Sequence, residues 1–261
     1  MAAPGKERSV SMSTPAVERP PGESFLRVRS AVKRFGGLTA VDNVTFDVGR
    51  GEIVSIIGPN GAGKTTLFNL VTGQLKPTSG EVSLNGEVIN ALPPDRRARL
   101  GLGRTFQIAK PLVALTALEN VMVGSFLHHR RLGAAEAKAR EVLDEVGLAQ
   151  RAAIRASQLT LSERRRLEVA RALALDPSVI LLDEVMAGLN PSEVGEAIAL
   201  FQRLNASGLT FLIIEHNLKV VRAFSERVIV LDRGAKIAEG NAEHILSTPE
   251  VVTAYLGSRR R

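Results

Sequence analysis

The chain has 261 residues, of which 44% are hydrophobic and 23% charged, a composition that suits one globular unit with a substantial core. It contains no cysteine, which excludes disulfide bonds and thiolate metal sites, and no apolar stretch long enough for a membrane-spanning helix. The net charge of +7 suits an anionic membrane surface or simply a well-solvated protein. Nucleic acid is not an expected partner, because there is no RNA-binding signature and only 4% of the residues are aromatic.

The N-terminal segment is rich in proline, serine and charge and lacks the apolar core of a secretory signal. We expect residues 1–24 to form a disordered tail, because such a segment cannot bury enough apolar surface to fold. At the other end, residues 258–261 form a basic tail that closes with three arginines.

The first elements after the tail are predicted strands. Alternating apolar and polar residues predict strands at 26–32 and 39–48, with a Phe-Gly-Gly turn at 35–37 between them. The largely apolar run at 53–57 predicts a buried strand, which is followed by a glycine-rich turn and a helix at 64–73.

The remainder of the chain alternates between strand and helix patterns. A turn at 77–80 precedes a strand at 81–84, and the pattern then becomes helical from about 108 to 173. Strands that alternate with helices predict an α/β fold with a mainly parallel sheet. The later elements are expected as strands at 179–182, 211–214 and 228–231 and a helix at 192–206.

Residues 58–65 read Gly-Pro-Asn-Gly-Ala-Gly-Lys-Thr, which matches G-x-x-x-x-G-K-[ST] at every fixed position. Glycines let the backbone approach phosphates closely, and the exposed amides and the following helix N-terminus attract anions. Lys64 can reach the terminal phosphates, and the Thr65 hydroxyl can bind Mg²⁺. The alternative is a glycine-rich turn by chance, which the buried strand before it and the helix after it disfavour. The expected phosphate-binding residues are Gly58, Pro59, Asn60, Gly61, Ala62, Gly63, Lys64, Thr65 and Thr66.

Two adjacent acids follow the apolar strand predicted at 179–182. In an open α/β sheet, ligands gather beyond the carboxyl ends of the strands. We therefore expect Asp183 to hold the Mg²⁺ of the nucleotide and Glu184 to orient or deprotonate the attacking water. The same acids could instead begin an exposed turn, but the phosphate-binding loop upstream favours the catalytic interpretation.

The ordered set of motifs resembles the ATPase subunits of ATP-binding-cassette transporters from Phe25 to Gly257. The resemblance implies a cassette domain at 25–257, with a P-loop NTPase core built on a parallel sheet. It also implies an antiparallel β subdomain near the N-terminus and a helical insert at about 108–172. ATP is then the expected substrate and Mg²⁺ the expected metal.

The same resemblance assigns further residues. Phe35 stands where the family stacks an aromatic ring on adenine, although a ring beside a Gly-Gly turn could also pack in the core. Gln107 matches the loop glutamine that contacts Mg²⁺, the attacking water and the permease. His216 matches the switch histidine that binds the γ-phosphate, although a lone histidine is more often structural. Residues 188–190, Gly-Leu-Asn, look like the loop that crosses to the partner ATPase.

Several stretches look more specifically like the ATPases of branched-chain amino acid importers, namely RTFQ, ENVMVG, LEVARAL, AGLNP, EHNLKVV and AYLG. Related ATPases for urea, short amides or lipopolysaccharide export share some of these stretches, so the solute stays open. The resemblance implies membrane-spanning permease subunits and a second ATPase subunit as partners, and a solute-binding protein as an indirect one. It also implies a peripheral position on the cytoplasmic face of the inner membrane.

The family signature usually reads L-S-G-G-Q, whereas the aligned residues 159–163 read Leu-Thr-Leu-Ser-Glu. The resemblance places Thr160, Ser162 and Glu163 over the nucleotide of the opposite subunit, with a helix N-terminus facing the γ-phosphate. Thr160-x-x-Glu163 is also a capping box, so the segment could simply start its helix well. Alternatively, a carboxylate and two extra side chains weaken one composite site. Val185, at a position where proline is usual, is a milder departure.

We expect an active subunit, because Lys64, Asp183, Glu184 and His216 are all present. A cassette that binds ATP with little turnover is the alternative that the unusual signature raises. A soluble ATPase that acts on nucleic acid or ribosomes is a rival class. Such proteins commonly carry two cassettes or a long coiled-coil insert, whereas this chain has one cassette and no such insert.

Overall fold

The computed structural model describes residues 24–105, 111–248 and 251 of the chain. The expected tails at 1–24 and 258–261 lie outside these residues, except for Ser24, which begins the first strand. The expected site residue Gln107 also lies outside them. In the described part of the chain, no helix is both long enough and apolar enough to cross a membrane.

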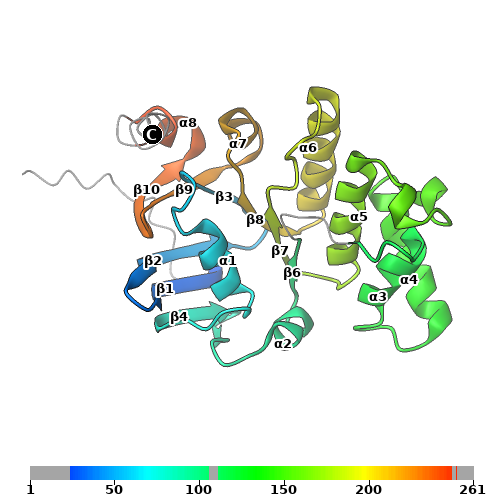
Figure 1. Cartoon of the computed structure of the whole chain (residues 1–261), viewed down its shortest axis with the longest axis horizontal. Coiled ribbons are helices and arrows are strands. Elements are labelled where there is room, and N and C mark those ends of the chain that lie inside the picture. The colour runs from blue at the N-terminus through cyan, green and yellow to red at the C-terminus, as the bar shows by residue number, and fades with distance from the viewer. Residues whose placement is uncertain (1–23, 106–110, 249–250, 252–261) are drawn as a thin grey trace, which may run out of the picture.

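The smaller sheet is antiparallel and contains, among the described residues, four strands in the order β2-β1-β4-β5. Figure 1 shows β2, β1 and β4 side by side. Strands β1 (Ser24–Phe35) and β2 (Leu38–Gly49) confirm the expected antiparallel region and run further than predicted. Phe35 is the last residue of β1 rather than part of the turn, because it pairs directly with Leu38. Strand β4 (Ser79–Leu84) begins inside the predicted turn, because Ser79 already pairs with Val32, and the short β5 (Glu87–Val88) follows it.

The larger sheet confirms the predicted α/β fold. Its described strands lie in the order β10-β9-β3-β8-β7-β6, and every neighbouring pair is parallel except β10 with β9. Three of these strands are buried along their whole length, which explains why they read as largely apolar runs in the sequence. They are β3 (Ile53–Ile57), β7 (Val179–Asp183) and β8 (Thr210–Ile214), and the others are β6 (Leu102–Arg104), β9 (Arg227–Asp232) and β10 (Ala235–Asn241).

Two of the predicted helices form close to their expected bounds. Helix α1 (Lys64–Val71) starts in the phosphate-binding loop and ends two residues before the predicted end at Gly73. Helix α6 (Pro191–Ala206) follows β7 and starts at a capping box between Asn190 and Glu193. The structure adds three short helices that the sequence did not predict, α2 (Pro94–Arg99), α7 (Leu218–Phe224) and α8 (Ala242–Ile245).

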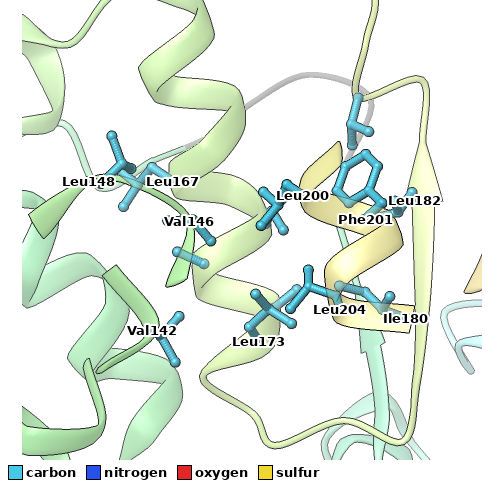
Figure 2. Close-up of a cluster of buried hydrophobic side chains, with 14 of the residues drawn as sticks. Val142, Val146, Leu148, Leu167, Leu173, Ile180, Leu182, Leu200, Phe201 and Leu204 are labelled. Atoms are coloured by element: carbon cyan, nitrogen blue, oxygen red, sulfur yellow. The ribbon is translucent and has the colours of Figure 1, made fainter. Parts of the chain in front are cut away.

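The stretch predicted as helical contains, in its described part, α3 (Ala117–Ser125), α4 (Leu132–Glu145) and α5 (Leu161–Leu173). We call residues 111–173 the helical region. These helices gather at one side of the molecule, away from the smaller sheet (Figure 1). Buried side chains of α6, among them Leu200, Phe201 and Leu204, lie between β7 and α5 and so join the helical region to the larger sheet (Figure 2).

A buried arginine from α2 contacts the C-terminal end of helix α1. Arg97 of α2 is fully buried, and its Nη1 donates to the carbonyl oxygens of Leu70 and Val71, each at 2.7 Å. Its Nε and Nη2 donate to the carbonyl oxygens of Leu92, at 3.0 Å, and Asn90, at 3.3 Å. Burial lowers the pKa of Arg97 to about 10, a value still high enough for the side chain to be charged at neutral pH. A cation therefore satisfies two of the last carbonyls of the helix that begins at the phosphate-binding loop.

Candidate functional site

Three adjacent strands of the larger sheet deliver several of the expected site residues to one edge. Strand β8 lies between β3 and β7, and all three are parallel, so their carboxyl ends meet at the same edge. The phosphate-binding loop follows β3, Glu184 follows β7, and His216 lies two residues after β8. Sheet topology thus brings together segments that are far apart in the sequence.

The phosphate-binding loop is pressed against neighbouring backbone, which explains its glycines. A Cβ on Gly58 would lie 2.1 Å from the carbonyl oxygen of Leu231, and a Cβ on Gly63 would lie 2.3 Å from that of Ala40. Both glycines also have positive φ angles, +151° and +96°. The loop is held further because Gly234 donates from its amide to the carbonyl oxygen of Ala62, at 3.1 Å.

Lys64 is buried and folded back onto the loop. Its Nζ donates to the carbonyl oxygens of Gly58, at 2.8 Å, and Pro59, at 3.0 Å. Burial lowers the pKa of Lys64, while the carboxylates of Glu184 and Asp183 oppose that shift. A phosphate oxygen is a stronger acceptor for this ammonium than a neutral carbonyl, so the group is suited to move onto an anionic ligand.

A cavity of about 550 Å³ opens beside the loop. Phe35 lies at this cavity with 46% of its surface exposed, which excludes the alternative of a core-packing ring. The Lys33 ammonium lies 5.2 Å from the centroid of the same ring. Four residues at the cavity were not expected from the sequence, namely Leu38, Thr39, Ala40 and Arg233. The lining comprises Phe35, Leu38, Thr39, Ala40, Asn60, Gly61, Ala62, Gly63, Lys64, Thr65, Thr66, Glu184 and Arg233.

Asp183 has one carboxylate oxygen engaged and one unengaged. Its Oδ2 accepts a hydrogen bond from Nη2 of Arg104 at 3.1 Å, whereas its buried Oδ1 accepts none from the described residues. Burial raises the pKa of Asp183, and the Arg104 cation opposes that shift. Arg104 is a partner that we did not single out from the sequence, although it stands three residues before Gln107.

The oxygens present fit the expected Mg²⁺. An unengaged carboxylate oxygen on Asp183 and the exposed hydroxyl residue Thr65 are the hard donors that this ion prefers. Among the described residues, no group of three or more His, Cys, Asp or Glu side chains could hold a metal ion alone. A Mg²⁺ ion here would therefore take its remaining ligands from phosphate and water, as is usual for this ion.

Glu184 and His216 lie close together at the same edge. Glu184 adopts a φ of +50°, uncommon for a residue with a side chain, and its amide donates to the carbonyl oxygen of Ile214 at 3.0 Å. Its Oε1 lies 3.9 Å from Nδ1 of His216. The His216 side chain is 57% exposed, so the alternative of a structural core histidine is excluded.

Glu215 is a buried acid at this edge that the sequence interpretation passed over. It is 2% exposed, and its Oε1 accepts no hydrogen bond from the described residues. Burial raises its pKa, while the charge of His216 and the backbone amides of His216 and Met186 oppose the shift. The only sequence signal was its place directly before the expected switch histidine.

The segment at 160–163 forms the capping box that the sequence suggested. Thr160 Oγ1 accepts from the amide of Glu163 at 3.2 Å, and Glu163 Oε2 accepts from the amide of Thr160 at 2.9 Å. Glu163 Oε1 also accepts from Nε of Arg151 at 2.7 Å. The amide of Thr160 is the main cause that lowers the pKa of Glu163, and Arg151 adds to it.

The segment does not line the cavity at the phosphate-binding loop. Ser162 and Glu163 are buried, whereas Leu161 is 49% exposed at the start of α5. The carboxylate that departs from the family signature is therefore engaged by its own helix and by Arg151. A contribution of Thr160, Ser162 and Glu163 to the nucleotide of a partner subunit stays a prediction.

The chain matches known proteins over most of its length. Residues 41–187, more than half of the chain, match the family described as ABC transporter. The high-affinity branched-chain amino acid transport ATP-binding protein LivG of Salmonella typhimurium is 39% identical over 251 residues, which cover 90% of this chain and 98% of that protein.

Two solved structures share the fold. An ATP-binding cassette of an ABC transporter in its ADP conformation aligns with a TM-score of 0.83 and 33% identity, covering 90% of this chain and all of that one. A dimeric cassette in a post-hydrolysis state with ADP and Pi aligns with a TM-score of 0.76 and 30% identity, covering 83% of this chain and 98% of that one. The chain is thus a member of the ABC transporter family, the ATP-binding subunit whose hydrolysis of ATP is coupled to transport.

Proposed function

We propose that this ATPase powers an importer for branched-chain amino acids or related small solutes. The observation that carries the proposal is the 39% identity to LivG over nearly the full length of both chains. The stretches quoted above, which also resemble branched-chain importers, support it. Membrane-spanning permease subunits on other chains would form the pathway, and a solute-binding protein would act through them.

In this proposal the residues of the cavity bind ATP. The amides of residues 58–65 receive the phosphates, Lys64 leaves the carbonyls of its own loop for a phosphate oxygen, and Phe35 stacks on the adenine. Asp183, Thr65 and Gln107 would hold Mg²⁺, which would supply positive charge against the developing charge on the phosphates. The unengaged Oδ1 of Asp183 supports this assignment.

Hydrolysis is assigned to the two groups beside the loop. Glu184 orients the attacking water and accepts its proton, and His216 contacts the γ-phosphate, with Gln107 assisting. The 3.9 Å between Glu184 Oε1 and His216 Nδ1 supports a shared ligand, since a water or a phosphate oxygen could contact both groups.

We propose that the segment at 160–163 contacts the nucleotide bound to a second cassette. Two subunits would close head to tail over two ATP molecules, each presenting Thr160, Ser162 and Glu163, together with residues 188–190, to the nucleotide of its partner. The absence of the segment from the lining of the cavity supports this arrangement, as does the dimeric relative. Closure of the two subunits, at the cytoplasmic face of the membrane, would drive the rearrangement of the permease. ATP can shift the equilibrium toward the closed state only by as much as it binds that state more tightly than the open one.

Uptake measurements test the solute assignment. Labelled leucine, isoleucine and valine would be followed in cells that carry the wild-type chain, Lys64→Ala, or the exposed control Lys76→Ala. We expect Lys64→Ala to abolish uptake at a normal protein level and Lys76→Ala to leave it unchanged. Normal uptake with Lys64→Ala would overturn the branched-chain assignment and leave membership of the family intact.

A second candidate is a cassette that binds ATP with little turnover, which the departure from the signature favours. The capping box and Arg151 engage the departing carboxylate, which supports the active subunit instead. Steady-state ATP hydrolysis by the assembled complex separates the two candidates, because only the active subunit loses turnover when Glu184 is replaced.

A further inference from the structure

Arg104 joins the expected metal carboxylate to the helix that follows the phosphate-binding loop. It is the last residue of β6, next to β7, and its side chain is 8% exposed. Its Nη2 donates to Oδ2 of Asp183 at 3.1 Å, and the Asp183 side chain is 2% exposed. The other oxygen of that carboxylate, Oδ1, is buried and accepts no hydrogen bond from the described residues.

The other side of the guanidinium contacts the last turn of α1 and the residues that follow it. Nη1 of Arg104 donates to Asn69 Oδ1 at 2.6 Å, Thr72 Oγ1 at 3.1 Å and Gln74 Oε1 at 3.2 Å. The guanidinium also lies 5.8 Å from the centroid of the Phe68 ring. Because a guanidinium is planar and donates in fixed directions, these contacts fix where Nη2 points.

A carboxylate that is held through one oxygen can no longer rotate freely, so its second oxygen keeps one direction. We propose that Arg104 is a positioning residue for the Mg²⁺ site: it engages Oδ2 of Asp183 so that Oδ1 stays oriented for the cation. The bond to Asn69 in α1, together with those to Thr72 and Gln74 just after it, ties that orientation to α1, whose first residue is Lys64 of the phosphate-binding loop. The inference rests on the proposed assignment of Asp183 to Mg²⁺.

The test measures metal binding separately from nucleotide binding on the full-length chain. Mn²⁺ would be titrated in the presence of a non-hydrolysable ATP analogue and followed by electron paramagnetic resonance, and binding of a fluorescent ATP analogue would be measured in EDTA. The variants are Arg104→Gln, Arg104→Lys, Asp183→Asn and the matched control Arg99→Gln. Arg99 is exposed and donates to the carbonyl oxygen of Leu127 in the helical region.

We expect Arg104→Gln to weaken Mn²⁺ binding by about 10-fold to 100-fold, the usual range for loss of a group that orients a metal ligand. Nucleotide binding in EDTA should change by less than about 2-fold, Arg104→Lys should fall between wild type and Arg104→Gln, and Arg99→Gln should match wild type.

Three outcomes would overturn the proposal. They are wild-type Mn²⁺ affinity in Arg104→Gln, an equal loss of nucleotide binding in EDTA, and failure of both Arg104 variants to fold. The last two would make Arg104 a structural support of α1. Wild-type Mn²⁺ affinity in Asp183→Asn would instead remove the metal assignment on which the inference rests.

Discussion

The edge of the larger sheet and the start of α5 hold their expected site residues in different ways. At the sheet edge, the positions follow from three parallel strands and from glycines that admit close backbone contacts. At the start of α5, they depend on the bonds among Thr160, Glu163 and Arg151. A side-chain substitution at the sheet edge should therefore reduce activity with little loss of stability. A substitution at the start of α5 should reduce the function of that segment and the stability of the chain together.

The sharpest test of the sheet edge is Glu184→Gln, which removes a proton acceptor and keeps the shape. We expect ATP hydrolysis to fall by about 100-fold to 10,000-fold, the usual contribution of a general base, while the melting temperature changes little. Steady-state hydrolysis and ATP binding would be compared with those of Glu87→Gln, an exposed acid on β5. A wild-type rate in Glu184→Gln would contradict its role as the base.

The backbone contacts of the same edge can be broken with one methyl group. Gly58→Ala places a Cβ 2.1 Å from the carbonyl oxygen of Leu231, so we expect a loss of roughly 2–4 kcal/mol in the free energy of unfolding. Gly195→Ala, in the middle of α6 with open space around it, should gain about 0.5–1 kcal/mol instead. Equal effects of Gly58→Ala and Gly195→Ala on the free energy of unfolding in urea would show that the close contact at Gly58 does not destabilise the variant.

Glu215 tests the sheet edge through pH. Its pKa in the folded chain is raised above 4.5, so ionisation costs stability as the pH rises through that raised value. Glu215→Gln cannot ionise, and we expect its free energy of unfolding to exceed that of wild type by on the order of 1 kcal/mol at pH 8. The difference should shrink toward pH 5. A difference that is independent of pH in thermal melts would contradict a raised pKa for the buried Glu215 carboxyl.

The start of α5 should respond in the opposite direction and more weakly. The pKa of Glu163 is lowered below 4.5, so its contribution is present above pH 4.5 and is lost as the pH falls through the folded value. Because Arg151 is 53% exposed, we expect Arg151→Gln to cost only about 0.5 kcal/mol. A double-mutant cycle with Glu163→Gln measures the coupling energy between the two side chains. A coupling energy of zero would show that Arg151 does not stabilise the start of α5 through Glu163.

The sequence predicted the elements that are buried on both sides. Strand β3 has the predicted bounds, and β7 and β8 differ from them by one residue, because a continuous apolar run is a strong signal. Strand β6 was missed, since it has three residues and ends in an arginine, whose side chain is 8% exposed. Strand β10, which includes Lys, Glu and Gly, lacks such a run.

The candidate site shows the same division. The capping box at Thr160 was predicted, because both partners lie within three residues and local spacing reveals them. The contact of Arg104 with Asp183 spans 79 residues, and that of Arg151 with Glu163 spans 12 residues across a turn. Neither pair leaves a local pattern, so only the folded chain identifies these two arginines.

The buried Arg97 has a consequence for how this corner of the protein can change over time. A Cβ on Gly73 would lie 2.6 Å from Nε and 3.0 Å from Cζ of Arg97, so the guanidinium occupies the space that a side chain at position 73 would need. A larger residue at 73 would displace the group that satisfies the carbonyls of Leu70 and Val71. Positions 73 and 97 are therefore coupled, and we expect their residues to covary among relatives rather than change one at a time.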